Sequence, residues 1–255
     1  MITLKSAREI ELMRRAGKIT AAARALAGEM VKPGVTTREI DKAVHRFIKS
    51  QGAEPSFLNY NGYPASVCIS VNDEIIHGIP GARRIHTGDI VSVDVGASIG
   101  GFTGDCAGTY PVGEVSEEAR RLMEVTRQSF FEALKVVREG NRISDIGAAV
   151  QEYCESRGFG VVRDYVGHGV GRHLHEAPEV PNYVPNRRER RPNPRLVKGM
   201  CLAIEPMITA GDWHIRVLDN DWTVVTVDGS LAAHYENTVC VTDGEPEILT
   251  MADDI

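Results

Sequence analysis

Five side chains of types that bind metal ions occur in segments predicted to be strands or glycine-rich turns. They are four carboxylates and one imidazole: Asp94, Asp105, His168, Glu205 and Glu236. Oxygen donors with a single nitrogen suit a pair of divalent first-row metal ions, whereas structural zinc sites are built mainly from cysteine and histidine. The sequence therefore predicts a site for divalent cations rather than a structural zinc site.

The first two carboxylates can be placed relative to each other from the strand pattern. Residues 90–95 alternate in character, which predicts a strand with Asp94 on one face. If the following hairpin turns about Ile99 and Gly100, Asp94 and Asp105 lie directly opposite each other, with Cβ atoms about 5 Å apart. Two facing carboxylates repel, so a cation between them would explain the arrangement. Taken alone, the pair favours a simpler interpretation as two solvent-facing strand residues, and the rest of the chain changes that balance.

The segment 165–178 carries two histidines in a glycine-rich setting. Glycines around His168 allow the backbone to bend and to approach an ion closely, and His175 follows seven residues later. A single histidine in such a turn is more often structural than a ligand, but two histidines followed by two more carboxylates are hard to explain that way. Pro206 cannot donate a backbone hydrogen bond, which predicts that Glu205 lies at a strand edge or irregularity.

The composition is that of an ordinary globular protein. The 255 residues are 42% hydrophobic and 25% charged, which fits one domain or two halves. The net charge of −6 argues against a general nucleic-acid binder, and no apolar run is long enough to span a bilayer or to form a signal-peptide core. Five cysteines without metal-type spacing predict reduced thiols in a cytoplasmic protein. The basic cluster at 187–195 predicts a solvated loop, with an RNA or acidic partner as the weaker alternative.

Four helices and several strands are needed to position these residues. Two capping boxes, Ser6 with Glu9 and Thr36 with Glu39, open the first two helices. The predicted helices cover about 6–28, 36–52, 116–140 and 144–158. The predicted strands cover 66–71, 90–95, 102–110, 161–167, 200–208, 222–227 and 234–242.

The second and fourth predicted helices echo each other in sequence. At a constant offset of 106, residues 31–52 match 137–158 at nine positions without a gap, including the glycines at both ends. We interpret this match as an internal duplication, in which two halves, about 1–110 and 111–255, each contain a helix pair followed by strands around a pseudo-twofold axis. The halves are expected to form a single catalytic domain.

Five ordered blocks give the sequence a specific resemblance to a known family. It resembles the type I methionine aminopeptidases, which belong to the pita-bread metallopeptidases. The blocks are NGYPASVCISVNDEIIHGIP (61–80), VSVDVGASIGGFTGDCAGTY (91–110), GHGVGRHLHEAP (167–178), AIEPMI (203–208) and YENTVCVT (235–242). The resemblance implies an α/β (α+β) fold with duplicated pseudo-twofold halves, in which mostly antiparallel strands form a curved sheet covered by helices. From the sequence itself we expect no N-terminal extension domain.

The resemblance implies a site with two metal ions. Asp94 would chelate one ion, Asp105 and Glu236 would bridge both, and His168 and Glu205 would complete the other. Two such ions can share and deprotonate a water, and the resulting hydroxide would attack the carbonyl of the first residue of the substrate. Fe(II), Mn(II) and Co(II) are the expected ions, with Zn(II) as a further candidate.

The remaining catalytic roles also follow from the resemblance. Glu205 would carry the proton from the attacking water. His175 would contact the scissile peptide and stabilise the tetrahedral intermediate, and His77 would lie near the leaving residue. Without the family match, a buried loop histidine would be the preferred interpretation of His77.

Four residues match positions that line the methionine pocket in the family: Tyr60, Tyr63, Cys68 and Trp222. Aromatic rings around a thioether make physical sense, because sulfur packs favourably on aromatic edges; ordinary core aromatics would be the alternative.

Three positions depart from the common pattern. Leu174 replaces a frequent Phe, Phe57 replaces a smaller residue, and His234 replaces a frequent Gln. The first two are expected to reshape the pocket rim. The third is expected to tune a metal ligand or to add a titrating group.

The expected activity is removal of the initiator methionine from nascent proteins when the second residue is small. A proline-directed aminopeptidase of the same fold and a non-catalytic pita-bread binding protein are the alternatives. The expected partners are nascent polypeptide N-termini and, transiently, the ribosome, without a membrane or a specific nucleic acid. We expect a monomer, because no predicted element shows a surplus apolar face.

Overall fold

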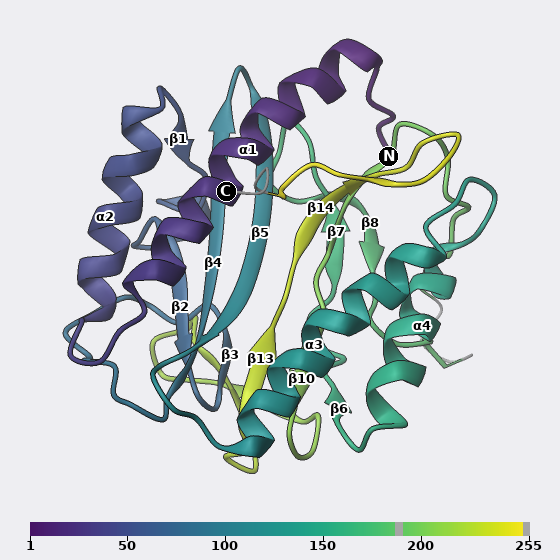
Figure 1. Cartoon of the computed structure of the whole chain (residues 1–255). Helices are drawn as coiled ribbons and strands as arrows, with labels where there is room; N and C mark the ends of the chain where they lie inside the picture. Colours follow the sequence, from purple (N-terminus) through teal and green to yellow (C-terminus); the bar gives the residue numbers. More distant parts are fainter. Residues whose placement is uncertain (187–190, 252–255) are drawn as a thin grey trace.

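The structure is a computed structural model that describes residues 1–186 and 191–251. Residues 187–190 of the predicted basic loop lie outside the described part. Two pairs of helices cover the strands on one side of the molecule (Figure 1). The helices are α1 (Ala7–Met30), α2 (Thr37–Ser50), α3 (Glu117–Lys135) and α4 (Ile143–Glu155). No helix in the described ranges is long and apolar enough to cross a membrane.

Local side-chain bonds explain where the first three helices begin. Ser6 and Glu9 form the predicted capping box of α1, and Thr36 and Glu39 form that of α2. In each box a hydroxyl oxygen and a carboxylate accept backbone N–H groups that have no partner within the helix. The Ser116 side chain caps α3 in the same way, though without the reciprocal bond. All three predicted helix starts are confirmed.

The predicted boundary between the third and fourth helices is wrong by several residues. Helix α3 ends at Lys135 rather than near Gly140, and the Asn141 side-chain amide donates to the carbonyl of Val136 at its end, 2.9 Å away. Helix α4 begins one residue before the predicted Ser144. The 106-residue offset nevertheless holds, because Thr37, the first residue of α2, corresponds to residue 143, the first of α4.

The strands of the described residues form four antiparallel sheets. The first has the order β1-β4-β2 with β5 paired to β4, and the largest has the order β15-β14-β9-β7-β8. The two smaller sheets are β13-β10-β6 and β11-β12-β3. The strands are β1 (Glu54–Pro55), β2 (Val67–Val71), β3 (Glu74–Ile76), β4 (Ile90–Ile99), β5 (Phe102–Pro111), β6 (Gly160–Val161), β7 (Gly167–Gly169), β8 (Glu176–Val180), β9 (Cys201–Ile204), β10 (Met207–Thr209), β11 (Ile215–Val217), β12 (Val224–Thr226), β13 (Ala232–His234), β14 (Asn237–Cys240) and β15 (Glu247–Ile248).

The register of the β4–β5 hairpin corrects one prediction. A two-residue turn at Gly100 and Gly101, with φ of 61° and 79°, joins the strands. Positive φ at both positions is typical of the tight turns that match strand twist. Because this turn is centred one residue later than predicted, Asp94 pairs with Ala107 and not with Asp105. The pairing partner of Asp94 is thus two residues further along β5 than predicted. Because side chains alternate between faces with a period of two, both carboxylates stay on the same face, where they are diagonal neighbours.

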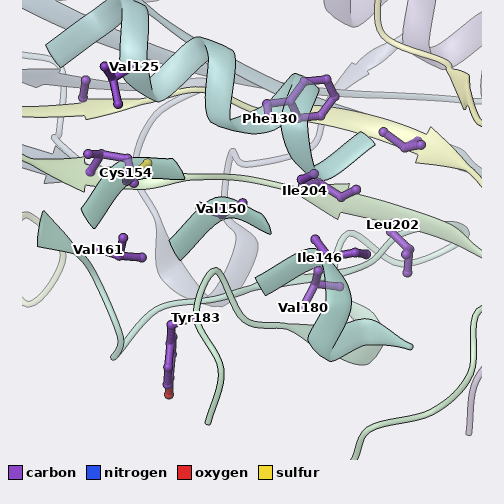
Figure 2. Packing of buried hydrophobic residues seen from close by; sticks show 14 of the residues in the cluster. Val125, Phe130, Ile146, Val150, Cys154, Val161, Val180, Tyr183, Leu202 and Ile204 are labelled. Atoms are coloured by element: carbon purple, nitrogen blue, oxygen red, sulfur yellow. The ribbon is translucent and has the colours of Figure 1, made fainter. Parts of the chain in front are cut away.

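Each helix pair has its own hydrophobic core. Helices α1 and α2 pack on the first sheet through buried aliphatic side chains such as Val44 and Val93. Helices α3 and α4 pack on strands that include β9 of the large sheet. Phe130 of α3, Ile146 of α4 and Ile204 of β9 belong to this second buried cluster (Figure 2). Strand β5 of the first sheet contacts β14 of the large sheet, so the two halves of the chain meet at these two strands.

Helix α1 approaches β5 unusually closely. A Cβ atom added to Gly104 would lie 2.8 Å from the Cα of Gly17, and one added to Gly17 would overlap the carbonyl oxygen of Leu249. The Thr20 hydroxyl donates to the Gly104 carbonyl at 3.2 Å. This contact fixes the backbone immediately before Asp105.

Candidate active site and metal centre

Strand β14 lies beside β5 (Figure 1). The predicted ligands converge where β5 meets the start of β14. The N–H of Glu236 donates to the Ala107 carbonyl at 3.0 Å, and the N–H of Ala107 donates back at 3.2 Å. The Thr238 hydroxyl donates to the Asp105 carbonyl at 2.9 Å. These bonds join the two sheets and bring Asp105 and Glu236 to the same place.

Glu205 reaches the same site from an irregularity between two strands, as Pro206 predicts. Strand β9 ends at Ile204 and β10 begins at Met207. The carbonyl of Glu205 accepts a 2.8 Å hydrogen bond from the buried side-chain amide of Asn182. Asn182 is a supporting residue that the sequence reasoning missed.

His168 faces this cluster with a defined nitrogen. Its Nδ1 donates to the carbonyl of Gly169 at 2.8 Å, so its Nε2 is free to accept or to ligate. Nε2 lies 3.7 Å from Asp105 Oδ2 and 3.5 Å from Glu205 Oε1. Burial, followed by the nearby His175, lowers the pKa of His168 to about 3, so the ring is neutral at physiological pH.

The carboxylates are strongly perturbed because they are crowded and buried. Burial raises the pKa of Asp94 to about 7. Burial, together with the neighbouring carboxylates, holds the pKa values of Asp105, Glu205 and Glu236 well above their usual range. One oxygen each of Asp94, Asp105 and Glu236 is buried and has no hydrogen-bond partner within residues 1–186 and 191–251. Buried, unpartnered carboxylate oxygens with an imidazole beside them are the donor set that divalent cations take.

Two overlapping groups of ligand atoms can be distinguished. Asp105, His168 and Glu236 form one, and Asp94, His234 and Glu236 form the other, each with ligand atoms within 4.8 Å of one another. Glu236 belongs to both groups. The arrangement therefore suits two cations that share a carboxylate.

A cavity of about 300 Å³ opens beside the carboxylates. His77 and His175 line it, together with the predicted pocket residues Tyr60, Tyr63, Cys68 and Trp222. Its size is at the lower end of the range for small-molecule sites, which suits one amino-acid side chain and its neighbouring peptide bond.

The two cavity histidines are held differently. His77 has a φ of 58°, an uncommon conformation for a residue other than glycine. Burial, with a contribution from His175, lowers its pKa to about 4. His175 lies at the cavity mouth, where its Nδ1 is 2.7 Å from the Tyr60 hydroxyl and its ring centroid is 4.2 Å from that of His168. Partial burial lowers the pKa of His175 as well.

The far end of the cavity is apolar and aromatic. The rings of Tyr63 and Trp222 meet edge to face with centroids 5.0 Å apart. Cys68 and the two residues that depart from the family pattern, Phe57 and Leu174, belong to the same buried cluster. Tyr165, which the sequence reasoning missed, packs against His77 with centroids 5.5 Å apart. Its position three residues before His168 was the available signal.

Comparison with known proteins identifies the family. Residues 11–243 match the metallopeptidase family M24. The chain belongs to this family. The family is one of metal-dependent hydrolases, which agrees with the buried carboxylates and imidazoles of the site.

Similar M24 proteins extend over nearly the whole chain. A methionine aminopeptidase of Clostridium acetobutylicum is 54% identical over 99% of this chain and 100% of its own length. Methionine aminopeptidase 1 of Bacillus subtilis is 48% identical over 98% of this chain and 99% of its own. The predicted resemblance is confirmed.

Solved structures confirm the pita-bread fold. A methionine aminopeptidase of Thermotoga maritima superposes with a TM-score of 0.94 at 45% identity, covering 98% of this chain and 100% of that one. A prolidase of Pyrococcus furiosus has a TM-score of 0.77 at 25% identity and is covered over only 66% of its length. The M24 chain is therefore more similar to the methionine-directed branch than to this proline-directed enzyme.

Proposed function

We propose that the chain is a metal-dependent aminopeptidase that removes the initiator methionine when the second residue is small. The observation that carries this proposal is a cavity lined by aromatic rings and Cys68, which suits a thioether and opens directly onto the buried carboxylates. The relatives named methionine aminopeptidase support it over the full length of the chain. A proline-directed activity is not favoured, because the matched prolidase is less similar and much longer.

The metal-binding part of the proposal has five ligands: Asp94, Asp105, His168, Glu205 and Glu236. Two divalent cations held by this set would supply an activated water near neutral pH and polarise the substrate carbonyl. Fe(II), Mn(II) or Co(II) are the proposed ions, with Zn(II) as a further candidate.

The side chains of the protein would bind the substrate and transfer the proton of the attacking water. Glu205, next to His168, would take the proton of the attacking water and deliver it to the leaving amine. The Tyr60 hydroxyl lies 2.7 Å from Nδ1 of His175, and if it donates to this atom, the proton of the neutral ring lies on Nε2. That N–H would donate to the substrate oxygen as negative charge develops on it. Neutral His77 would hydrogen-bond to the leaving residue.

The aromatic end of the cavity would select methionine. Trp222, Tyr63 and Cys68 offer an apolar surface on which a thioether packs favourably. Phe57 and Leu174 lie in the same cluster and would set the width of this end. Charged and β-branched side chains would bind poorly there.

We further propose that both halves, about 1–110 and 111–255, act as one catalytic unit. Two of the five ligands come from the first half and three from the second, which supports this division. The five cysteines are free and buried, which supports a cytoplasmic location. A monomer in transient contact with the ribosome is the proposed working form, acting on nascent polypeptide N-termini.

Release of free amino acids from Met-Ala-Ser and Ala-Pro-Ala tests the function. We expect metal-stripped protein to be inactive and to release only methionine after addition of Mn(II) or Co(II). Cleavage of Ala-Pro-Ala would move the chain to the proline-directed branch, and inactivity on both peptides would favour a binding protein. Replacing His175 by Ala should lower kcat about 10²–10³-fold, whereas His173→Ala, an exposed neighbour, should leave it unchanged.

A further inference from the structure

His234 is a buried histidine that the activity described above does not use. It is the last residue of β13 and is 1% exposed. Neither ring nitrogen has a hydrogen-bond partner among the described residues. Burying an imidazole without hydrogen-bond partners costs free energy, so a binding partner outside the protein chain would account for its position.

The ring faces the carboxylate cluster. His234 Nε2 lies 3.7 Å from Glu205 Oε2 and 3.9 Å from Glu236 Oε2. These separations are too long for hydrogen bonds. Two ligand atoms that are each about 2.1 Å from one ion lie about 3–4 Å apart. The separation between His234 and Glu236 therefore fits coordination of both side chains to one cation.

His168 gives an internal standard for this geometry. Its Nε2 lies 3.7 Å and 3.5 Å from two carboxylate oxygens of the same cluster. His168 and His234 thus present Nε2 to the cluster at similar separations, and both face Glu205, one toward each carboxylate oxygen. His168 belongs to the ligand group with Asp105 and Glu236, while His234 belongs to the group with Asp94 and Glu236.

We propose that His234 is a direct nitrogen ligand of the cation held by Asp94 and Glu236. Each of the two ions then has one imidazole, instead of one ion having purely oxygen ligands. This inference rests on the proposed two-metal site but adds a sixth protein ligand to it. A neutral imidazole adds a donor without adding charge, and it favours Co(II), Ni(II) and Zn(II) over Mn(II) at this position.

Counting imidazoles on cobalt tests the proposal independently of activity. Metal-stripped wild-type protein is loaded with two equivalents of Co(II), and X-ray absorption fine structure gives the average number of imidazole ligands. We expect one per cobalt, or two per chain, in the wild type, and one per chain in His234→Gln and in His168→Gln. The exposed His86 serves as the matched control, because His86→Gln should leave the count at two.

Mn(II) titration gives a second readout. The weaker of two Mn(II) sites should lose at least about 10–100-fold in affinity in His234→Gln, the range for disturbing a ligand environment. One imidazole per chain in the wild type, or an equal count in the wild type and a folded His234→Gln variant, would overturn the proposal. The wild-type count also tests the proposal if that variant fails to fold.

The two-metal site and the role of His234 can be refuted separately. If the wild type binds two ions and releases methionine but carries one imidazole, only the role of His234 is wrong. If it binds fewer than two ions, the two-metal site itself is wrong and the role of His234 falls with it.

Discussion

Removing the metal ions should make the folded chain progressively less stable as the pH rises from 5 to 8. In the metal-free protein, burial raises the pKa of Asp94 to about 7, compared with about 3.9 in an unfolded chain. The folded state therefore binds more protons than the unfolded state over this range. The contribution of Asp94 to the free energy of unfolding is fully present below pH 4. It is lost as the pH rises toward 7, because in this range the folded protein keeps the Asp94 proton and the unfolded chain does not.

The size of the effect follows from the shift. About three pKa units correspond to about 4 kcal/mol from Asp94 alone. The other three carboxylates shift in the same direction and add to this loss at higher pH. Between pH 5 and 8 about two of these units apply, or about 2.7 kcal/mol, and for a chain of 255 residues this corresponds to a fall in Tm of about 5–11 °C. Saturating Mn(II) should reverse the fall, because the cations balance the carboxylate charges.

Thermal unfolding of metal-stripped protein at pH 5, 6, 7 and 8 measures this effect. Asp94→Asn should flatten the metal-free curve and should make the metal-free protein more stable than the wild type at pH 8. Asp219→Asn, at an exposed position, is the matched control and should not change the slope. A metal-free Tm that stays constant or rises between pH 5 and 8 would refute the reasoning.

Three further predictions concern stability and substrate binding. Although burial opposes it, the hydrogen bond from Lys5 and its neighbours hold the pKa of Glu176 at about 2; Glu176→Gln should therefore lower the free energy of unfolding by about 2–3 kcal/mol at pH 7, and urea titrations should show this difference shrinking as the pH falls from 4 toward 2. Gly17→Ala would overlap Leu249 and should destabilise the protein by about 1–3 kcal/mol in urea unfolding; an unchanged midpoint would contradict the close packing of α1. Trp222→Leu should raise KM for Met-Ala-Ser about 2–10-fold with little change in kcat, and steady-state kinetics in which only kcat falls would count against a pocket role.

Local chemistry made much of the fold predictable. The capping boxes at Ser6 and Thr36 depend only on residues three apart, and both were found where the sequence places them. The hairpin register was mispredicted because the stretch before Phe102 contains several glycines, and the choice of turn depends on the pairing of the whole strand. The 106-residue offset correctly linked α2 with α4, since both helices begin three residues after a glycine.

The sequence could predict which candidate ligand residues lie close together, but not what surrounds them. The residue types at positions such as Asp94 and His168 predict divalent metal ions from the sequence alone. The amide of Asn182, which binds the Glu205 carbonyl, comes from a loop with no sequence signal of its own. Within the described part of the chain the His234 ring has no hydrogen-bond partner, and this depends on strands distant in sequence, so only the structure could reveal it.

The glycine contact between α1 and β5 has a consequence for metal choice. Gly17 and Gly104 set how far the helix stands from the strand, and Asp105 is the next residue along that strand. A wider spacing between α1 and β5 would move the Asp105 carboxylate relative to the proposed ligands of the second half of the chain. Ions differ in bond length by a few tenths of an ångström, so a helix-packing change on the far side of β5 could alter which metal the protein prefers without touching any ligand.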